Sequence, residues 1–520
     1  MSQPFYVTTA INYPNGPPHV GHAYEAIATD AIARFQRLSG REVFFLTGTD
    51  EHGLKMAQAA RERGVTPAAL ADEMSSIFKA MDERLHISYD RFIRTTEADH
   101  HRASQVIWQA MADRGDIYLG RYEGWYSVRD EAYYDEDELS TADSGEKLSP
   151  QGTPVEWTVE ESWFFRLSAY QDRLLAHYEA NPDFIRPETR RNEVMRFVEG
   201  GLSDLSISRT SFDWGVKVPG SENHVMYVWL DALTNYLTGV GYPDAKSETY
   251  GKFWPADLHI IGKDVVRFHA VYWPAFLLSA GLPLPKQVFG HGHVLLRGEK
   301  MSKSLGNVVD PDSLIDAFGV DAVRYFLLRD VTFGQDGSYS PDAIVARVNA
   351  DLANSFGNLA QRTLSFIAKN AGAVLPRGGK GEPADAELLA FVRQATAVDL
   401  PACFNALALS QGIEAWIRAV FACNQYIDAQ APWALRKTDP ERMIAVLATL
   451  CEAIVDLAIA ISPVIPVAAA KLLDQMHVPE EERSFTVLGD RSRYERLAAA
   501  GRALELPTPI FPRIEAPAGS

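Results

Sequence analysis

The chain has 520 residues, of which 47% are hydrophobic and 23% are charged. These values are typical of globular proteins and exclude a fibrous or largely disordered chain, and the length predicts two to four domains. The 68 acidic residues outnumber the 50 basic ones, which gives a formal net charge of −18. A nucleic-acid partner would therefore have to bind where basic residues are locally concentrated.

The three cysteines, Cys403, Cys423 and Cys451, are too few for a disulfide framework in a chain of this length and favour a reducing compartment. Residues 1–10 do not show the basic and apolar segments of a secretory signal. The most apolar stretch, residues 445–473, is interrupted by acidic residues and prolines, which predicts core helices rather than a membrane span. We expect a cytoplasmic protein with no membrane partner.

The N-terminal residues predict a strand, a helix and a second strand. Residues 5–11 are apolar and rich in β-forming types, and the turn formers at 13–18 precede a helical pattern with one apolar face. Gly40 fits the end of that helix, and residues 43–46 form another apolar run. Two strands joined by a helix indicate a βαβ unit and a parallel sheet.

The next patterns, in chain order, are helix at 66–85, strand at 92–95, helix at 97–114, strands at 224–229 and 257–261, and helix at 265–278. Residues 116–157 are rich in Gly, Tyr and Asp, which indicates a small inserted domain that splits the sheet. After residue 341 the pattern is helical to about residue 473, with a Gly-rich break at 377–381. The remaining residues are mixed and Pro-rich, and we predict no firm structure for them.

Two histidines lie where the first strand meets the following helix. His19 and His22 follow the turn formers, and the edge of an open α/β sheet combined with a helix N-terminus is a binding site for anions. Imidazoles three residues apart can face one phosphate, and Gly21 leaves room for a nucleotide base. The alternatives are two surface residues or half of a metal site, although the local sequence does not clearly supply a third ligand.

A second cluster, residues 300–307, follows a predicted strand or loop at 291–296. It contains Lys300 and Lys303 together with hydroxyl side chains and a glycine, which suits a triphosphate whose negative charge grows as pyrophosphate leaves. The alternative is a solvated basic loop, and this cluster by itself does not exclude it.

Together, the His19-Val20-Gly21-His22 and Lys300-Met301-Ser302-Lys303-Ser304 motifs are the signature pair of class I aminoacyl-tRNA synthetases. Among these enzymes the chain resembles the methionyl-tRNA synthetases, from about residue 4 to about residue 473, including segments 49–53, 227–232 and 262–264. The resemblance implies ATP-dependent attachment of L-methionine to initiator and elongator methionine tRNAs through methionyl-adenylate, with release of AMP and pyrophosphate. It implies ATP with Mg²⁺ as the cofactor.

The resemblance also implies an α/β fold, with a Rossmann-type parallel sheet split by an inserted connective domain and followed by an α-helical anticodon-binding domain. The predicted division is 1–115 for the first half of the catalytic domain, 116–223 for the insertion, 224–295 for the second half, 296–340 for the KMSKS-loop and stem-contact region, 341–475 for the helical domain and 476–520 for a C-terminal tail.

By this resemblance His19 and His22 would stabilise the reacting phosphate, and Lys300 and Lys303 would hold the leaving phosphates. The positions that match ATP contacts are Gly21, His22, Glu25, Gly262, Asp264, Val294 and Lys303. Those that match the methionine pocket are Ala10, Ile11, Tyr13, Asp50, Trp229, Ala232, Leu233, Tyr236, Val265 and His269.

Within that pocket, Asp50 would receive the substrate ammonium, and Tyr13 with Trp229 would close on the side chain. An apolar pocket with aromatic rings suits the polarisable thioether. Family members often have proline where this chain has Leu233. Ordinary core packing at helical spacing is the alternative for Trp229 and Tyr236.

Three residues of the helical region match positions that read the CAU anticodon. Trp433 would stack on an unpaired base, and Asn358 with Arg362, four residues apart on one helix face, would bond base edges. The alternatives are a polar surface pair and a tryptophan buried at a helix start.

Family members often carry Cys₄ zinc knuckles in the insertion, after a Tyr-x-Gly-Trp-Tyr run. In this chain that run ends at Tyr126, and Ser127 and Asp130 lie where cysteines would be expected. Because the first cysteine is Cys403, a thiolate site cannot form there, so we expect no zinc and no metal-ligating residues.

Other classes fit less well. Isoleucyl, valyl and leucyl enzymes need a larger editing insertion, a cysteinyl enzyme needs a thiolate-bound zinc, and nucleotidylyltransferases do not account for the helical region. A non-catalytic RNA-binding relative is disfavoured by the intact histidine and lysine motifs. We expect a monomer, because the additional tRNA-binding domain through which some relatives dimerise is not found.

Overall fold

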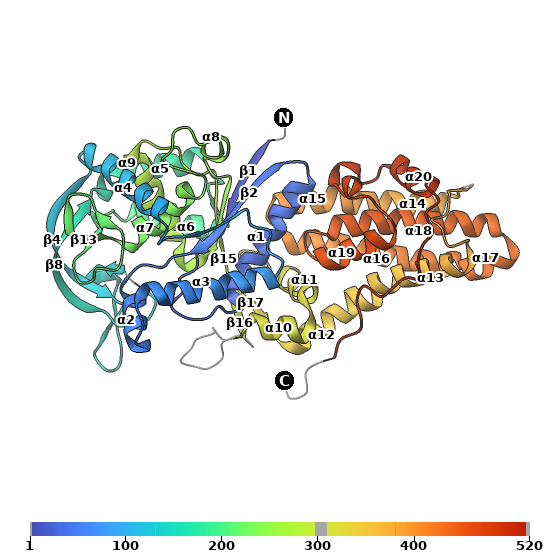
Figure 1. Ribbon diagram of the computed structural model, residues 1–520, viewed down its shortest axis with the longest axis horizontal. Coiled ribbons are helices and arrows are strands. Elements are labelled where there is room, and N and C mark those ends of the chain that lie inside the picture. Colours follow the sequence, from blue (N-terminus) through green and yellow to red (C-terminus); the bar gives the residue numbers. More distant parts are fainter. Residues whose placement is uncertain (1–2, 131, 297–308, 380, 516–520) are drawn as a thin grey trace.

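A computed structural model describes residues 3–130, 132–296, 309–379 and 381–515. An α/β part formed by the earlier residues lies beside an elongated bundle of C-terminal helices (Figure 1). The predicted βαβ unit is present: β1 (Pro4–Thr8) pairs in parallel with β2 (Glu42–Thr49), and α1 (Val20–Leu38) connects them. Gly40 follows the end of α1 with φ +84°, a conformation that glycine adopts without strain.

The main sheet has six strands in the order β3-β2-β1-β14-β15-β9, and every pairing in it is parallel. The remaining strands of this sheet are β3 (Arg91–Arg94), β9 (Ile185–Arg186), β14 (Leu258–Gly262) and β15 (Val288–His291). On one side β1 is next to β2, the following strand of the chain, and on its other side it is next to β14, a much later strand. The strand order therefore reverses beside β1. Open α/β sheets bind ligands at the carboxyl end of such a position.

Both faces of this sheet are buried. Phe5 and Val7 pack into one core with α1, whereas Tyr6, which points to the opposite face, lies in a second core with Leu233 and Trp273. The helices that contribute to these two cores include α3 (Pro67–Arg84), α4 (Ala98–Asp113), α7 (Val228–Thr238), α8 (Glu248–Phe253) and α9 (Trp273–Ala280). The helix α2 (Leu54–Arg63) packs against α3 in a separate small core.

Residues between α4 and α7 form smaller antiparallel sheets. The long strands β4 (Ile117–Ser127) and β8 (Glu156–Phe165) pair with each other and with short neighbours. The other elements are β5 (Ala132–Tyr134), β6 (Ser140–Thr141), β7 (Lys147–Leu148), α5 (Gln171–Ala180), α6 (Glu188–Glu199), β10 (Leu205–Ser206), β11 (Ser208–Arg209), β12 (Lys217–Val218) and β13 (Ser221–Met226).

Two strands differ from the sequence prediction. The strand predicted at 224–229 ends at Met226, pairs within a separate three-stranded sheet, and is followed directly by α7, so Trp229 is helical. In addition, β9 belongs to the predicted insertion but pairs with β15 at the edge of the main sheet. A strand of two residues has no periodicity by which sequence could reveal it.

Between the parallel sheet and the bundle lie β16 (Val294–Leu296), α10 (Pro311–Phe318), α11 (Val320–Asp330) and β17 (Gly337–Tyr339). The bundle itself is helical, as predicted. Its helices are α12 (Pro341–Arg347), α13 (Asn358–Asn370), α14 (Pro383–Arg393), α15 (Leu400–Asn405), α16 (Leu409–Gln430), α17 (Pro432–Thr438), α18 (Pro440–Ile461), α19 (Pro466–Gln475) and α20 (Arg491–Ala499).

The helix α20 lies in the segment for which the sequence predicted no firm structure. Arg493 of α20 is fully buried and forms an ion pair with Asp456 of α18. Within the described ranges, α18 is the one helix long and apolar enough to cross a membrane, with hydropathy 2.3. Because 94% of that apolar window is buried against the rest of the protein, α18 is a core helix.

Candidate active site

A cavity of about 410 Å³ opens at the carboxyl end of β1 and β14, where the strand order reverses. The structure brings together in this cavity the described residues that the sequence predicted for catalysis, ATP and methionine. They are Ala10, Ile11, Tyr13, His19, Gly21, His22, Glu25, Asp50, Trp229, Ala232, Leu233, Tyr236, Gly262, Asp264, Val265, His269 and Val294. Lys300 and Lys303 lie outside the described residues.

His19 and His22 form a stacked pair at the start of α1. His19 is the N-cap, its Nδ1 accepts a hydrogen bond from the Gly21 N–H at 3.1 Å, and His22 Nδ1 accepts from the His19 N–H at 3.1 Å. The ring centroids are 3.8 Å apart. Because Nδ1 is the acceptor in both rings, each neutral imidazole carries its proton on Nε2. The capping geometry therefore prepares two donors for an anion at a helix N-terminus.

Glu25, one turn further along α1, joins the ends of two strands. Its Oε1 accepts from the Ala10 N–H at 2.8 Å, just after β1, and its Oε2 lies 2.7 Å from His291 Nε2 at the end of β15. The strand between these two is β14. Glu25 thus fixes the floor of the cavity across three strands.

A neighbouring set of loops surrounds the position predicted for the nucleotide. His293 Nε2 lies 2.8 Å from Asp264 Oδ2, and the Lys263 ammonium forms an ion pair with Asp336 at 2.8 Å. Asp336 also accepts from the His293 N–H at 2.8 Å. These contacts hold the segments after β14 and β15 against the residues before β17.

The part of the cavity beneath α7 is largely apolar, and its tyrosine and histidine are hydrogen-bonded to each other. Trp229 stacks on Phe268 with ring centroids 3.8 Å apart. The Tyr236 hydroxyl lies 2.6 Å from His269 Nε2, and His269 Nδ1 lies 2.9 Å from the Val265 carbonyl. Burial lowers the pKa of His269 to about 4, so the ring is neutral, donates from Nδ1 and accepts at Nε2. The resulting wall suits an uncharged, polarisable side chain.

Asp50, at the carboxyl end of β2, is the buried acid of this region. Its backbone N–H donates to the Asn12 carbonyl at 2.8 Å, which holds the loops after β1 and β2 together. Asp50 lines the same cavity as the apolar wall.

Behind the cavity, the sequence analysis missed a buried network around Asp231 of α7. Its two carboxylate oxygens lie 2.6 Å from His52 Nδ1 and 2.7 Å from His100 Nε2. Although burial acts in the opposite direction, the two histidines hold the pKa of Asp231 well below its ordinary value. The network ties the Asp50 loop to α7, which carries Trp229.

Other lining residues were also missed by the sequence analysis: Asn12, Lys55, Asp130, Val228, Asn235, His291, Gly292 and His293. One signal could have found the last three. A His-x-His pair opens the segment predicted as a strand or loop at 291–296, and in the structure it lies at the carboxyl end of β15, the edge where ligands bind in a parallel sheet.

The predicted anticodon residues meet on the bundle. Asn358 and Arg362 lie one turn apart on α13, and Trp433 is the second residue of α17, with 45% of its surface exposed. The Arg362 guanidinium is 5.5 Å from the centre of the Trp433 ring and forms an ion pair with Asp428 at 2.7 Å. Asp428, which orients this guanidinium, was missed by the sequence analysis.

At the positions where a zinc knuckle would have cysteines, the structure has a hydrogen-bonded cluster. Asp130 Oδ2 accepts from the hydroxyls of Ser149 and Thr153, each at 2.6 Å, and Ser127 Oγ lies 2.6 Å from Thr153 Oγ1. Across the described ranges, no group of three or more His, Cys, Asp or Glu is placed to hold a metal ion.

Comparison with known proteins identifies the family. The family model described as tRNA synthetases class I (M) matches residues 5–364, and the anticodon binding domain of methionyl tRNA ligase matches residues 375–518. Methionine–tRNA ligase of Mesorhizobium japonicum is 59% identical over 98% of this chain and 97% of its own length. That of Mycobacterium bovis is 57% identical over 99% of both.

Among solved structures, methionyl-tRNA synthetase of Mycobacterium tuberculosis in complex with methionyl-adenylate is similar with a TM-score of 0.95 and 57% identity, over 98% of this chain and 100% of that one. The fold predicted from the sequence, a parallel α/β sheet followed by a helical anticodon-binding region, is confirmed. The cavity at the carboxyl end of β1, the two family models and the full-length relatives agree that this chain belongs to the methionyl-tRNA synthetases, the class I ligases that attach methionine to tRNA.

Proposed function

We propose that the cavity at the N-terminus of α1 forms methionyl-adenylate from L-methionine and ATP, and that the methionine is then transferred to initiator and elongator methionine tRNAs. The observation that carries this proposal is the convergence of the two histidines, the buried Asp50 and the apolar wall on one cavity. The 57% identical Mycobacterium tuberculosis structure that contains methionyl-adenylate supports it.

In this proposal the methionine carboxylate attacks the α-phosphate and pyrophosphate leaves. His19 and His22 donate from Nε2 to phosphate oxygens as negative charge grows there, and their capping bonds keep the rings oriented without further reorganisation. Lys300 and Lys303 hold the leaving phosphates. Catalysis is then mainly positioning and charge stabilisation.

The nucleotide lies over the segments that carry Gly21, Glu25, Gly262, Asp264 and Val294. Glu25 and Asp264 are already engaged by His291 and His293. An accompanying Mg²⁺ therefore fits best as an ion held by the phosphate oxygens of ATP rather than by a cage of protein ligands. It would add positive charge beside those phosphates.

Methionine lies with its ammonium at Asp50 and its thioether between Tyr13 and Trp229. Ala10, Ile11, Ala232, Leu233, Tyr236, Val265 and His269 complete the pocket. The neutral Tyr236–His269 pair offers no charge to the thioether, so the pocket disfavours charged amino-acid side chains.

Replacement of Trp229 with alanine tests the methionine pocket. We expect the KM for methionine to rise at least about tenfold, because a large apolar contact is lost, while the KM for ATP stays within about threefold. Methionine-dependent ATP–pyrophosphate exchange measures both. Trp229→Phe, which keeps a ring to stack on Phe268, is the control and should stay near wild type. An equal rise in both KM values would contradict the assignment.

We also propose that Asn358, Arg362 and Trp433 read the anticodon, with the exposed Trp433 ring stacking on an unpaired base.

The predicted domain division is retained as part of the proposal, with β9 added to the catalytic sheet. The protein is proposed to act as a monomer in the cytoplasm, and sedimentation of the purified enzyme tests its oligomeric state.

The insertion is proposed to fold without zinc, since hydroxyl and carboxylate groups satisfy one another around Asp130. Elemental analysis of the purified, fully active enzyme should give less than about 0.1 zinc per chain, because the family's thiolate ligands are missing. Dialysis against a chelator should leave the melting temperature unchanged. Stoichiometric zinc would contradict this proposal.

A further inference from the structure

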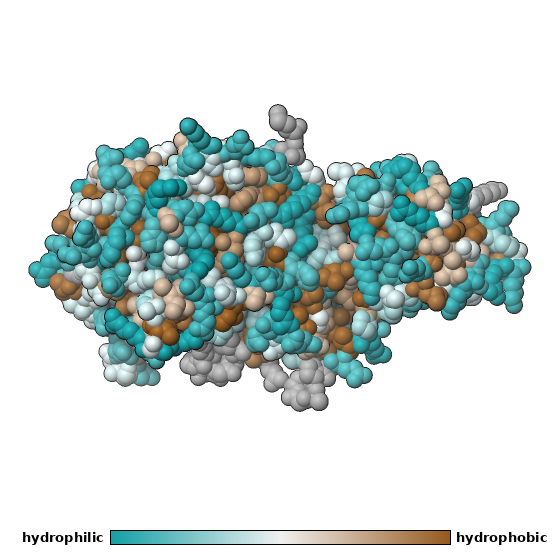
Figure 2. All heavy atoms as spheres, in the orientation of Figure 1, coloured by the Kyte–Doolittle hydropathy of each residue, from teal (hydrophilic) through white to brown (hydrophobic). Residues whose placement is uncertain are grey.

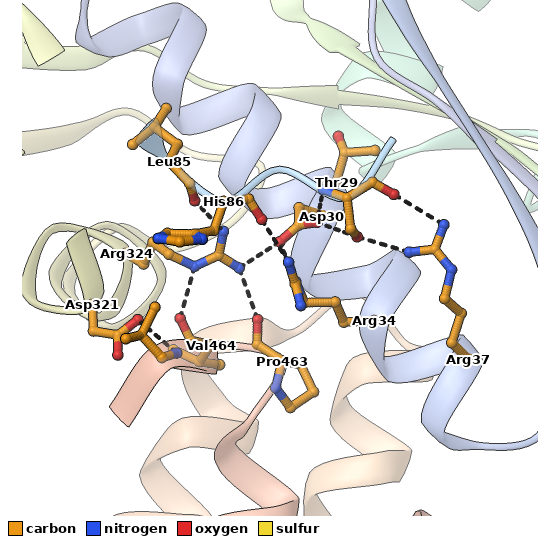
Figure 3. Close-up of polar contacts among 12 residues, drawn as sticks. Thr29, Asp30, Arg34, Arg37, Leu85, His86, Asp321, Arg324, Pro463 and Val464 are labelled. Atoms are coloured by element: carbon orange, nitrogen blue, oxygen red, sulfur yellow. Dashed lines mark hydrogen bonds and ion pairs between the residues drawn. The ribbon is translucent and has the colours of Figure 1, made fainter. Parts of the chain in front are cut away.

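Arg324 of α11 is fully buried at the junction of the catalytic part and the helical bundle. Its guanidinium makes four hydrogen bonds: to Asp30 Oδ2 at 2.6 Å, and to the carbonyls of Leu85 at 3.0 Å, Pro463 at 2.9 Å and Val464 at 3.0 Å. Figure 3 shows it between α1, the turn after α3 and the α18–α19 turn. One side chain thus joins segments that lie far apart in the sequence.

On the bundle side, α11 holds both ends of the α18–α19 turn. Arg324 donates to the two carbonyls that follow α18, and Asp321, one turn earlier on α11, accepts from the Ala468 N–H at 2.6 Å in the first turn of α19. A cation at the end of one helix and an anion at the start of the next complement the two helix dipoles. The turn is therefore fixed in position by main-chain contacts.

On the catalytic side, Asp30 lies in the middle of α1 and is fully buried. Besides Arg324 it accepts from the Ser88 N–H at 2.7 Å, the Ser88 hydroxyl at 2.6 Å and Arg34 Nε at 2.7 Å. The same helix begins with the His19 and His22 pair. The position of α1 relative to the bundle therefore depends on this carboxylate and its partner.

The far end of α18 is held beside the proposed anticodon residues. Arg442, in the first turn of α18, forms an ion pair with the Asp385 carboxylate and donates to Gln430 Oε1 at 2.8 Å, three residues before Trp433. Both α13 and α17 pack against α18. With 22 residues, α18 spans about 33 Å between this end and Arg324.

We propose that Arg324, with Asp321, is a positioning residue for tRNA charging. Through the α18–α19 turn, it fixes the distance and angle between the bundle and α1. In that arrangement a tRNA bound by its anticodon presents its acceptor end to the active site. The inference rests on the proposed anticodon role of α13 and α17. A buried ion pair that served stability alone would not need three main-chain acceptors from two further segments. Only the planar guanidinium group of arginine can bond these acceptors and the carboxylate at the same time.

The variant Arg324→Lys tests the proposal. Lysine keeps a cation next to Asp30 but lacks the planar guanidinium group that bonds the three carbonyls. Three quantities are measured on the folded full-length enzyme: methionine-dependent pyrophosphate exchange, the Kd for methionine tRNA, and the single-turnover rate of methionine transfer at saturating tRNA. We expect exchange within twofold and Kd within about threefold of wild type, and transfer slowed at least about tenfold, because small misplacements of reacting groups are costly.

Asp321→Ala provides a second variant that leaves the Arg324–Asp30 pair intact, and it should slow transfer in the same way. Asp321→Asn keeps an oxygen that accepts from Ala468 and should restore transfer to within about threefold. Transfer at wild-type rate in both Arg324→Lys and Asp321→Ala, or exchange slowed as much as transfer, would overturn the proposal. A separate measurement tests the anticodon role. If the wild-type enzyme binds a tRNA with a changed anticodon as tightly as the tRNA with the CAU anticodon, the anticodon role is wrong.

Discussion

Replacing His22 with asparagine should lower methionine-dependent pyrophosphate exchange about 100- to 1000-fold, which is the usual cost of removing one donor from a developing oxyanion. An asparagine Oδ1 can still accept from the His19 N–H, as His22 Nδ1 does at 3.1 Å, so the cap of α1 is retained. What is lost is the Nε2–H donor. The exchange rate at saturating methionine and ATP measures the effect.

The matched control is His22→Gln, whose longer side chain places an amide donor near the former Nε2 but gives up the capping acceptor. We expect it to retain more activity than His22→Asn and to melt at a lower temperature. Equal activities of the two variants, or exchange by His22→Asn close to wild type, would contradict the role assigned to the His22 Nε2–H. The KM for methionine should stay within about threefold in both, since neither change touches the apolar wall.

Trp433→Ala should abolish most tRNA charging while leaving methionine-dependent pyrophosphate exchange largely intact. Stacking of a base on an aromatic ring contributes about 1–3 kcal/mol, and Trp433 is 45% exposed. The cavity proposed to form the adenylate shares no described residue with α17. Initial rates of charging at limiting tRNA, compared with exchange rates of the same preparation, measure the separation of the two activities.

The control for this experiment is Trp433→Phe, which keeps an aromatic face next to the Arg362 guanidinium. It should charge tRNA within about tenfold of wild type. Equal loss of exchange and charging in Trp433→Ala would overturn the anticodon assignment, because it would indicate a general structural defect. Circular dichroism at the assay temperature establishes that both variants are folded.

Local pattern pointed to His19 and His22, which follow a turn at a helix start after a strand. Asp50 and the rest of the methionine pocket were predicted only through the resemblance to the methionyl-tRNA synthetases. The strand order itself, with β1 beside β14, depends on contacts between segments about 250 residues apart, such as Thr8 with His259. The local sequence pattern does not indicate which distant segments pair.

The residues that support the site could not be predicted from the sequence, for the same reason. His52 and Asp231 are 179 residues apart, and Arg324 and Asp30 are 294 apart. A buried ionic residue looks like an exposed one in sequence, since charged residues mostly lie on the surface. Likewise α2 is a short and strongly polar helix, so it was missed between the predicted elements.

The core helix α18 has a consequence for how the chain is made. A ribosome delivers α18 only after the parallel sheet and α11 have emerged, so this very apolar segment meets partners that are already folded rather than remaining exposed to aggregation. Its buried Asp456 receives its Arg493 partner later still, from α20. A nascent chain in which translation stops before α20 would lack the Arg493 partner of this buried acid. Completion of synthesis and stability of the bundle are therefore linked through α20, which supplies this ion pair and the buried Tyr494, whose hydroxyl donates to the Pro376 carbonyl.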